Sequence, residues 1–442
     1  MKRRDVLRWA GSASVAGGAA AAAGGAFASS AASAAASAAA PAQGPMPAPP
    51  ATAAVTLPDR ASFHYPADVC YLDAGTMHPI SRGAQAALDA YVSYRTVGQG
   101  RPPSMGFDDD EVRGKFARLI NAQPSEIAYV QSTTAGENLI LQALGLPERG
   151  AHVVVDTLHF FGSLPTYGEL ARQGVDVTWL RPRDGRIPIE DIERAVRKGT
   201  RLVALSQVST INGFEHDLRR VCEIAHAKGA LVYADIVHAA GCVPVDVRAT
   251  GVDFASCASY KWLMGDFGLG FLYVRKDRQA LLRPRQLGYY ALSAFAMHSL
   301  PFDPPEPPAR GKAAPPVDYA RRDDAQGLFG IGTYAHTGLA LLNHSLDYLH
   351  RVGVAAIQSH ALTLTARLKE ELPRRGYALF TPPESRSPLV TCVLQDARKK
   401  LSAPLNEARV RITLSANRFR VSVSVFNTLD DIDQLLAALP RL

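Results

Sequence analysis

Two apolar runs that each end near a charged residue constrain the fold of this chain most strongly. Residues 231–234 form one run, which ends at Asp235, and residues 252–258 form another, which Lys261 closely follows. Short, near-continuous apolar runs are typical of strands buried on both faces of an α/β sheet. Ligands of such sheets bind just beyond the carboxyl ends of the strands. An acid and a lysine at two such ends therefore predict a cofactor site.

Strand and helix patterns alternate upstream of these two runs. The alternation predicts an α/β fold in which helices cover both faces of a doubly wound, mainly parallel sheet. The expected strands are residues 127–131, 152–156, 175–180 and 202–206, and the expected helices lie around residues 137–144, 164–173, 189–198 and 218–228.

The first residues differ in composition from the rest of the chain. Residues 1–28 contain adjacent Arg3 and Arg4, an Ala/Gly-rich stretch and a small-x-small sequence ending at Ala28. This is the pattern of a twin-arginine export signal. Gly and Ser interrupt the stretch well before the roughly 20 apolar residues that a spanning helix needs. We therefore expect a periplasmic or otherwise exported protein, carried in folded form and free of the membrane after signal cleavage.

The remaining sequence suggests further boundaries. Residues 29–56 form an Ala/Ser/Pro linker with nothing to bury. We expect an N-terminal segment, 57–80, associated with a small C-terminal α+β domain at 339–442, and a large domain at 81–338. The proline-rich residues 300–317 are interpreted as a lid or contact arm, because they are too long for a simple connection.

Charge and cysteine content narrow the class of protein. The formal net charge is +7 at pH 7, and part of this excess lies in residues 1–28. A mild excess without basic runs or interleaved aromatic residues argues against nucleic-acid binding. The five cysteines are scattered and form no Cys-x-x-Cys pair. Neither a disulfide framework nor a metal site is indicated.

A hydroxyl-rich turn, Ser132-Thr133-Thr134, connects the expected strand at 127–131 to a helix. The N-terminus of a helix presents free N–H groups and the positive end of the helix dipole, which together with two hydroxyls suit a phosphate. Ordinary capping of the helix by Ser or Thr explains the turn about as well.

Asp235 and Lys261 suit one cofactor in particular. A lysine amine forms a Schiff base with an aldehyde cofactor, and pyridoxal phosphate needs a carboxylate that keeps its ring nitrogen protonated. A helix-capping aspartate and a solvent-facing lysine are the alternative interpretation. Spacing alone does not decide between the two.

Several motifs in one order resemble those of a known family. They are Asp-x-x-His-Ala-x-Gly at 235–241, Val-Asp-Phe at 252–254, Ser-Tyr-Lys at 259–261, Thr-Thr at 133–134 with Asn138, Arg-Val-Ser at 420–422 and Phe-Asn-Thr at 426–428. From about Tyr71 onward the chain resembles the class V aminotransferase family of pyridoxal-phosphate enzymes, which includes cysteine desulfurases, isopenicillin N epimerase and kynureninase. The stretch around the lysine is most similar to kynureninase. The resemblance implies fold type I, in which a large domain with a mainly parallel sheet precedes a smaller α+β domain.

The resemblance also implies a role for each matching residue. Lys261 would hold the cofactor as an aldimine, Asp235 would pair with its pyridine nitrogen, and His238 would lie near its phenolic oxygen. Arg420 would clamp the α-carboxylate of the substrate, for which a planar guanidinium is suited. A second group of residues would bind the cofactor phosphate: Thr133, Thr134, Ser259, Tyr260 and, from the neighbouring subunit of a homodimer, Thr333.

One cofactor-binding position has two candidates. The family stacks a histidine or aromatic ring on the cofactor near residues 159–163. The register of the sequence favours Phe160, with His159 as the second candidate. Whichever of the two does not stack would pack in the core.

Departures from the family pattern bear on the reaction. Desulfurases need a nucleophilic cysteine on a loop before the C-terminal arginine, but there is no cysteine between Ala403 and Arg420. Thr210 also stands where desulfurases carry an asparagine. We therefore expect an aminotransferase, epimerase or lyase that acts on a small amino acid or amine. The alternative is an exported binding or accessory protein that keeps the fold without turnover, since a fold alone does not fix function.

Overall fold

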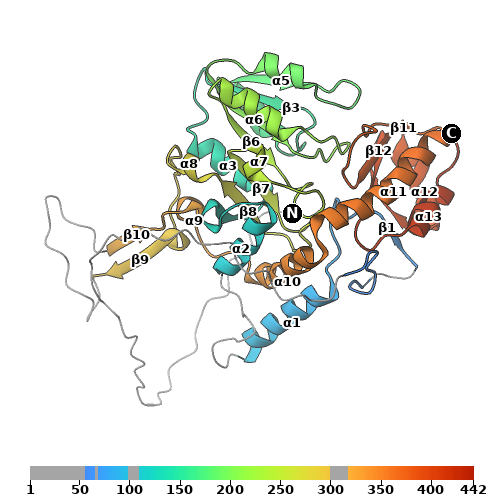
Figure 1. The fold of residues 1–442 in the computed structure, drawn as a ribbon, viewed down its shortest axis with the longest axis horizontal. Helices are drawn as coiled ribbons and strands as arrows, with labels where there is room; N and C mark the ends of the chain where they lie inside the picture. Colours follow the sequence, from blue (N-terminus) through green and yellow to red (C-terminus); the bar gives the residue numbers. More distant parts are fainter. Residues whose placement is uncertain (1–54, 65–67, 98–108, 299–316) are drawn as a thin grey trace, which may run out of the picture. The chain divides into compact units, whose positions relative to one another are not determined.

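Residues 127–274 contain a seven-stranded sheet with the strand order β2-β8-β7-β6-β5-β3-β4 (Figure 1). The computed structural model describes residues 55–64, 68–97, 109–298 and 317–442. The strands β3 to β7 pair in parallel, and β8 runs antiparallel to both of its neighbours. Their bounds are β2 Ile127–Val130, β3 His152–Asp156, β4 Asp176–Leu180, β5 Thr200–Ser206, β6 Leu231–Asp235, β7 Phe254–Ala258 and β8 Gly270–Val274. The predicted mainly parallel sheet is confirmed.

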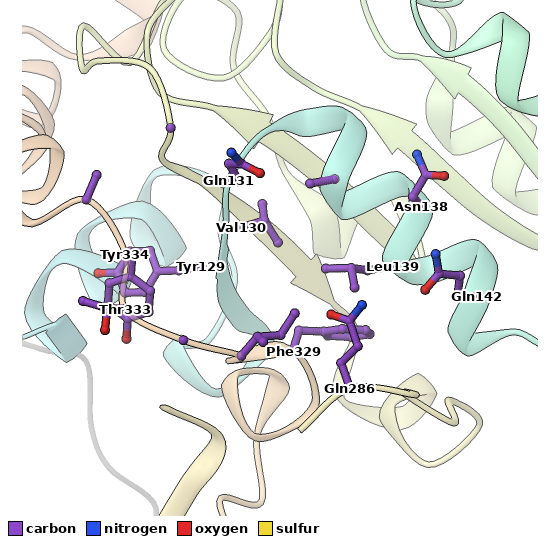
Figure 2. Close-up of a pocket in the computed structure, with 15 residues that line it drawn as sticks. Tyr129, Val130, Gln131, Asn138, Leu139, Gln142, Gln286, Phe329, Thr333 and Tyr334 are labelled. Carbon is purple, nitrogen blue, oxygen red and sulfur yellow. The ribbon is translucent and has the colours of Figure 1, made fainter. Parts of the chain in front are cut away.

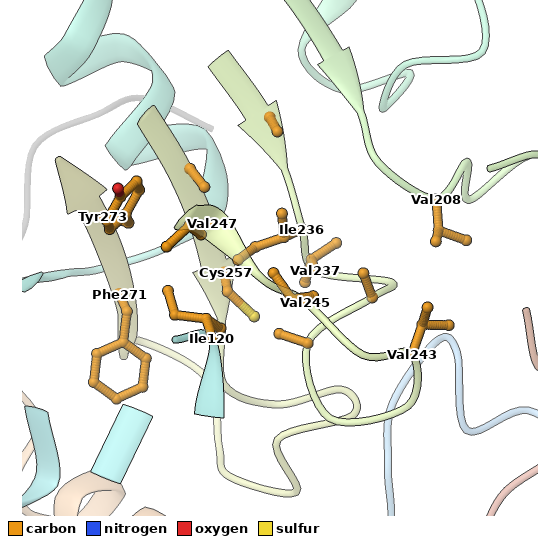
Figure 3. Packing of buried hydrophobic residues seen from close by; sticks show 14 of the residues in the cluster. Ile120, Val208, Ile236, Val237, Val243, Val245, Val247, Cys257, Phe271 and Tyr273 are labelled. Atoms are coloured by element: carbon orange, nitrogen blue, oxygen red, sulfur yellow. The ribbon is translucent and has the colours of Figure 1, made fainter. Parts of the chain in front are cut away.

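The apolar residues of these strands point alternately into two cores. Val154 belongs to one buried cluster, while its neighbours Val153 and Val155 belong to another. Figure 3 shows part of the first cluster, in which Cys257 of β7 lies close to Val237 and Val245 from the segment after β6, and Phe271 belongs to the adjacent strand β8. Burial of both faces explains why the strands read as continuous apolar runs.

Helices from both sides complete these two cores. Residues of α2 (Asp109–Leu119), α5 (Ile189–Ala195) and α6 (Leu218–Ala227) belong to the first cluster. Residues of α3 (Thr133–Ala143) and α4 (Leu164–Arg172) belong to the second. Shorter helical pieces are η2 (Pro124–Glu126), α7 (Val247–Thr250), α8 (Lys276–Gln279), η3 (Tyr289–Ala291) and α9 (Ala325–Phe329). The prediction that helices cover both faces is therefore confirmed.

The C-terminal residues form a second, smaller sheet with the order β11-β12-β15-β14. Its strands are β11 Ala378–Leu379, β12 Leu389–Val393, β14 Thr413–Leu414 and β15 Arg418–Ser422. It packs with α11 (Val354–Arg374), α12 (Ala397–Glu407) and α13 (Leu429–Ala438) around a separate core. The mixed α+β character is as predicted. Residues 410–414 form two short strands, β13 (Val410–Arg411) and β14, that pair with different partners.

The N-terminal segment joins the C-terminal part through β1 (Cys70–Tyr71), which pairs in parallel with β13. Helix α1 (Arg82–Val97) follows it, and its first turn is capped by the Ser81 hydroxyl, which accepts a hydrogen bond from the Ala84 amide at 3.1 Å. Helix α10 (His336–Val352) packs against α1 and α2. The predicted domain boundaries themselves stay predictions.

One antiparallel hairpin was not anticipated from the sequence. Strands β9 (Leu292–Met297) and β10 (Val317–Arg321) pair with each other, and most of their residues are exposed. The proline-rich arm predicted at 300–317 lies almost entirely outside the described residues, as do the signal at 1–28 and nearly all of the linker at 29–56. No helix in the described ranges is both long and apolar enough to cross a membrane.

Candidate active site

Polar side chains gather where the strands of the large sheet end. Ser206 and Asp235 are the last residues of β5 and β6, and Lys261 follows β7 in a short loop. Thr133 begins α3, and its hydroxyl accepts a hydrogen bond from the Ala258 amide at 3.0 Å. That bond ties the turn before α3 to the loop of Lys261. The predicted strand-end site is therefore formed by segments from four elements.

The amine of Lys261 is buried, and only 7% of the residue is exposed. Its Nζ lies 3.0 Å from Nε2 of His238. It also lies 5.9 Å from the ring centre of Phe160 and 5.7 Å from that of Tyr260. Burial lowers the pKa of Lys261 to about 8, an effect that nearby Asp235 partly offsets. A substantial part of this lysine is thus neutral near physiological pH, which an amine needs in order to attack an aldehyde.

The tautomer of His238 supports a neutral amine. The indole Nε1–H of Trp262 donates to Nδ1 of His238 at 3.2 Å, so a neutral imidazole carries its proton on Nε2. That proton points to Nζ of Lys261, which must then accept with a lone pair. Burial, and then the charges of Lys261 and Arg420, lower the pKa of His238 well below its ordinary value. The imidazole is therefore neutral, and the direction of its hydrogen bond to Nζ favours the neutral form of the amine.

Asp235 presents a buried carboxylate at the end of β6. One oxygen accepts a hydrogen bond from the Val237 amide at 2.9 Å, and the other accepts a long one from the Ser206 hydroxyl at 3.4 Å. Burial raises the pKa of Asp235, while the nearby His159 and the Val237 amide act in the opposite direction. A cationic partner is what such a carboxylate needs in order to stay ionised.

Two of the predicted phosphate ligands, Thr133 and Thr134, begin α3. The Ser132 hydroxyl caps this helix by accepting from the Ala135 amide at 3.1 Å, and Thr134 is half-buried. Tyr260 stacks on Phe267, with 4.3 Å between the ring centres. Ser259 differs from the other candidates because its hydroxyl donates to the Asp266 carbonyl at 2.6 Å. Its proton is used within this loop, so it offers a phosphate less than Thr134 does.

The two stacking candidates have different surroundings. Phe160 is half-buried and faces the amine of Lys261. His159 is fully buried and hydrogen-bonded on both ring nitrogens, to Ser206 and Glu137, each at 2.9 Å. The geometry thus favours Phe160 for stacking. It also differs from the expectation that the other residue packs in an apolar core, because His159 belongs to a polar network.

Arg420 lies on β15, and three threonines hold its guanidinium. Its Nη1 donates to the carbonyl and the hydroxyl of Thr210, both at 2.8 Å. Its Nη2 donates to the hydroxyls of Thr76 at 2.9 Å and Thr413 at 3.0 Å. Its Nε is buried and has no hydrogen-bond partner among the described residues. An unpaired donor of this kind suits an anionic group that binds from outside the chain.

Thr333 lines a cavity of about 530 Å³ beside the turn that precedes α3. Figure 2 shows Gln131 and Asn138 from that turn and helix around the same cavity as Thr333 and Tyr334. Neither Lys261 nor Asp235 lines this cavity. The contribution of Thr333 to a second subunit stays a prediction.

The backbone at Gly241 explains why the Asp-x-x-His-Ala-x-Gly motif ends in glycine. Its φ is +97°, which a residue with a side chain rarely adopts. A Cβ at this position would come within 2.4 Å of the Trp262 carbonyl, next to Lys261. The glycine therefore lets the loop of His238 approach the loop of the lysine.

Replacing Gly241 by alanine tests this close approach. Gly251 is a matched control, because its φ is +75° but the nearest atom to an added Cβ, on His226, lies 4.0 Å away. We expect Gly251→Ala to lower the free energy of unfolding by about 1 kcal/mol. Gly241→Ala should lower it by at least about 2 kcal/mol more, because backbone must move. Urea unfolding of both variants measures the difference, and equal losses would contradict the close approach.

A neutral amine, a buried carboxylate and a helix N-terminus at the edge of a mainly parallel sheet are the parts of a pyridoxal-phosphate enzyme of fold type I. The family model "Aminotransferase class-V" matches residues 106–435. The chain therefore belongs to the class V aminotransferase family, as the motifs predicted.

Individual relatives agree with this assignment. The chain is 30% identical over 307 residues to a probable cysteine desulfurase of Methanothermobacter thermautotrophicus, covering 68% of this chain and 72% of that one. It is 26% identical over 363 residues to the uncharacterized aminotransferase YcbU of Bacillus subtilis, covering 81% and 90%. The crystal structure of the Escherichia coli cysteine desulfurase CsdA has the same fold, with a TM-score of 0.73, 21% identity and coverage of 86% and 96%. Fold type I is thereby confirmed.

The cofactor of this family is pyridoxal phosphate, and the residues of the candidate site fit that cofactor. The buried Asp235 suits a ring nitrogen that carries a proton, and the lowered pKa of Lys261, about 8, makes its neutral amine accessible near neutral pH. The turn before α3 offers N–H groups and hydroxyls for a phosphate. The described residues contain no group of three or more His, Cys, Asp or Glu side chains that could hold a metal ion.

The lowered pKa of Lys261 predicts how the apoprotein takes up its cofactor. Only the neutral amine attacks the aldehyde, so the uptake rate should rise with pH and level off above about 8. An ordinary lysine would level off only above about 10.4. Stopped-flow absorbance over a range of pH measures this profile, with Lys228→Ala, a change of an exposed lysine, as the control. A rate that keeps rising beyond pH 10 would contradict the prediction.

Several residues of the site were not found from the sequence. Glu137 had one available signal, because it stands in the apolar pattern of α3 and is buried together with Ile140 and Leu141. An acid at such a position needs polar partners. Ser206, Trp262, Thr76 and Thr413 carried no signal of this kind.

Proposed function

We propose that this protein is a pyridoxal-phosphate enzyme that moves a proton at the α-carbon of an amino acid, as in transamination, epimerisation or elimination. The observation that carries the proposal is the position of the Lys261 amine, 3.0 Å from the proton-bearing Nε2 of His238. This contact favours a neutral amine, which can act as a base.

The cofactor, when bound, supplies an electron-poor ring that spreads negative charge away from the substrate's α-carbon. Asp235 would hold the protonated ring nitrogen through its negative charge. The Nζ of Lys261 takes up the proton and returns it. Nε2–H of His238, once Lys261 no longer accepts it, is a donor for a negative oxygen. Phe160, which faces the amine, covers the site on that side and helps to exclude water.

Arg420 supports an amino acid as substrate rather than a simple amine. Its unpaired Nε and its Nη2 lie on the same side of the guanidinium, where a carboxylate can accept from both. Thr76, which now accepts from Nη2, is exposed and can give way. A carboxylate and a guanidinium paired in a buried place orient the α-carbon toward Lys261.

The proposal does not include desulfuration by a cysteine of this chain, although relatives are named cysteine desulfurases. All five cysteines are free and buried. Cys392 comes nearest to Arg420 in the sequence, and it is fully buried on β12. Burial raises the pKa of its thiol to about 12, which leaves almost no nucleophilic thiolate at neutral pH.

A panel of L- and D-amino acids, each paired with the amine that lacks its carboxylate, tests this function. The visible spectrum of the holoprotein and the products are followed together. We expect a spectral change and product from at least one amino acid, and much less from its amine. Spectral changes without any product would favour the binding protein considered above, and no response to any amino acid would contradict the proposal.

We also propose that the protein acts as an exported homodimer. The twin-arginine pattern of residues 1–28 supports export, and the family resemblance supports a dimer. Changing both Arg3 and Arg4 to lysine should retain the protein in the cytoplasm, as cell fractionation would detect. Light scattering of the purified holoprotein measures its mass, and a monomer with full cofactor occupancy would exclude the dimer.

A further inference from the structure

A chain of hydrogen bonds leads from Asp235 into the protein, away from Lys261. The Ser206 hydroxyl donates to Oδ2 of Asp235 at 3.4 Å, and Nδ1 of His159 lies 2.9 Å from that hydroxyl. Nε2 of His159 lies 2.9 Å from Oε1 of Glu137. None of these four residues is more than 3% exposed. They come from α3, the loop after β3, and the ends of β5 and β6.

The direction of these bonds fixes where the protons lie. A carboxylate only accepts, so the single proton of Ser206 goes to Asp235, and its oxygen must accept from Nδ1–H of His159. Glu137 also accepts from the Ser163 hydroxyl and the Tyr167 hydroxyl, each at 2.5 Å. A carboxylate with three donors is ionised, and it accepts from Nε2–H of His159. Both nitrogens of His159 therefore carry protons, and its ring is cationic.

The pKa values of this pair agree with the geometry. Burial alone would lower the pKa of His159, but the charge of Glu137 and its hydrogen bond raise it above the ordinary value. Burial alone would raise the pKa of Glu137, but His159, Ser163 and Tyr167 lower it. The two groups therefore form a buried ion pair.

We propose that Glu137 and His159 are positioning residues that act through Ser206 to keep Asp235 ionised and aimed at the cofactor's ring nitrogen. This inference rests on the pairing of Asp235 with that nitrogen under the proposed function. Asp235, His159 and Glu137 together carry one net negative charge. A protonated ring nitrogen brings the buried group to neutrality, whereas a neutral ring would leave an uncompensated charge, which is costly in a buried place.

The ion pair also explains why His159 does not stack on the ring. Its two nitrogens are held in opposite directions by Ser206 and Glu137. Stacking would require it to leave both partners and would leave the Glu137 carboxylate buried without its cation. Phe160, its neighbour in the chain, is free to cover the site.

The test uses holoprotein loaded with cofactor that is labelled with nitrogen-15 in the pyridine ring. The ring-nitrogen chemical shift distinguishes the protonated from the unprotonated form and does not depend on turnover. Wild type should give the protonated value, and Asp235→Asn should lose it. We expect His159→Asn and Glu137→Gln to move the shift toward the unprotonated value. With an active amino acid, kcat of these two variants should fall about 10- to 100-fold while KM changes little. This is the usual effect of removing a residue that hydrogen-bonds to a functional side chain and orients it.

His152→Asn is the matched control. His152 is also buried and bonded through both ring nitrogens, to Thr200 at 2.8 Å and Thr178 at 2.9 Å. It is the first residue of β3, whereas the site lies beyond the carboxyl ends of the strands, at their other end. This variant should keep the wild-type shift even if it lowers thermal stability.

The outcomes separate the inference from the function on which it rests. A wild-type shift in His159→Asn and Glu137→Gln, together with a changed shift in Asp235→Asn, would overturn the role of the ion pair alone. An unchanged shift in Asp235→Asn would overturn the pairing of Asp235 with the ring. If the two ion-pair variants do not fold, Ser206→Ala, a loss of one hydroxyl, decides. A partial movement of its shift supports the inference, and none overturns it.

Discussion

Replacing Lys261 by alanine is expected to remove the visible absorption band of the holoprotein and to lower turnover by at least about 10³-fold. The amine is both the attachment point of the cofactor and the base that moves the proton. Within the described part of the chain, its Nζ contacts His238, Phe160 and Tyr260, none of which can form a Schiff base in its place. Absorbance of the purified variant with added cofactor and a product assay measure the two effects.

Lys228→Ala is the control for this experiment. Lys228 is exposed at the end of α6, so its loss should leave both the band and the turnover unchanged. Methylamine or another small amine added to Lys261→Ala should restore part of the activity, because it replaces the missing base. A variant that keeps the visible band would show that another lysine carries the cofactor, which would remove the basis of the proposed mechanism.

The elements that could be predicted from the sequence are the buried strands, because their residues form continuous apolar runs. The strands that end at Asp235 and Ser206 are apolar throughout because both faces of the sheet are covered, and the predicted and observed ends differ by a residue or two. The exposed hairpin of β9 and β10 lacks such a pattern, since it borders no core. The break between β13 and β14 depends on two different partners, β1 and β15, which local sequence does not specify.

Some residues of the site could likewise be predicted from the sequence, and others could not. Lys261 and Asp235 were found because each stands at the end of a strand, where the topology of an α/β sheet brings ligands together. The partners of Arg420 could not be found in this way. Thr210 is 210 positions away from it, and Thr76 is 344 positions away. The roles of Glu137 and His159 likewise depend on how the loop after β3 packs against α3, which local sequence does not specify.

The second large effect is expected at Arg420, where lysine is the most informative replacement. Burial lowers the pKa of Arg420, but its guanidinium remains a rigid fork that Thr210 and Thr413 hold in place. Lysine preserves a positive charge but has no fork, so it cannot donate two parallel bonds to a carboxylate. Losing such a buried pair costs about 2–5 kcal/mol, so we expect kcat/KM for amino acids to fall about 30- to 5,000-fold.

The amine that lacks the carboxylate provides the decisive comparison for Arg420→Lys. It makes no contact with the guanidinium, so its slow reaction should change by less than about threefold. Arg411→Ala, which removes an exposed arginine from the same part of the chain, should change neither substrate. If amino acid and amine instead lose activity equally, Arg420 serves only to join β15 to Thr210 and the N-terminal segment. The substrate's carboxylate must then be bound elsewhere, and the unpaired Nε would need a different explanation.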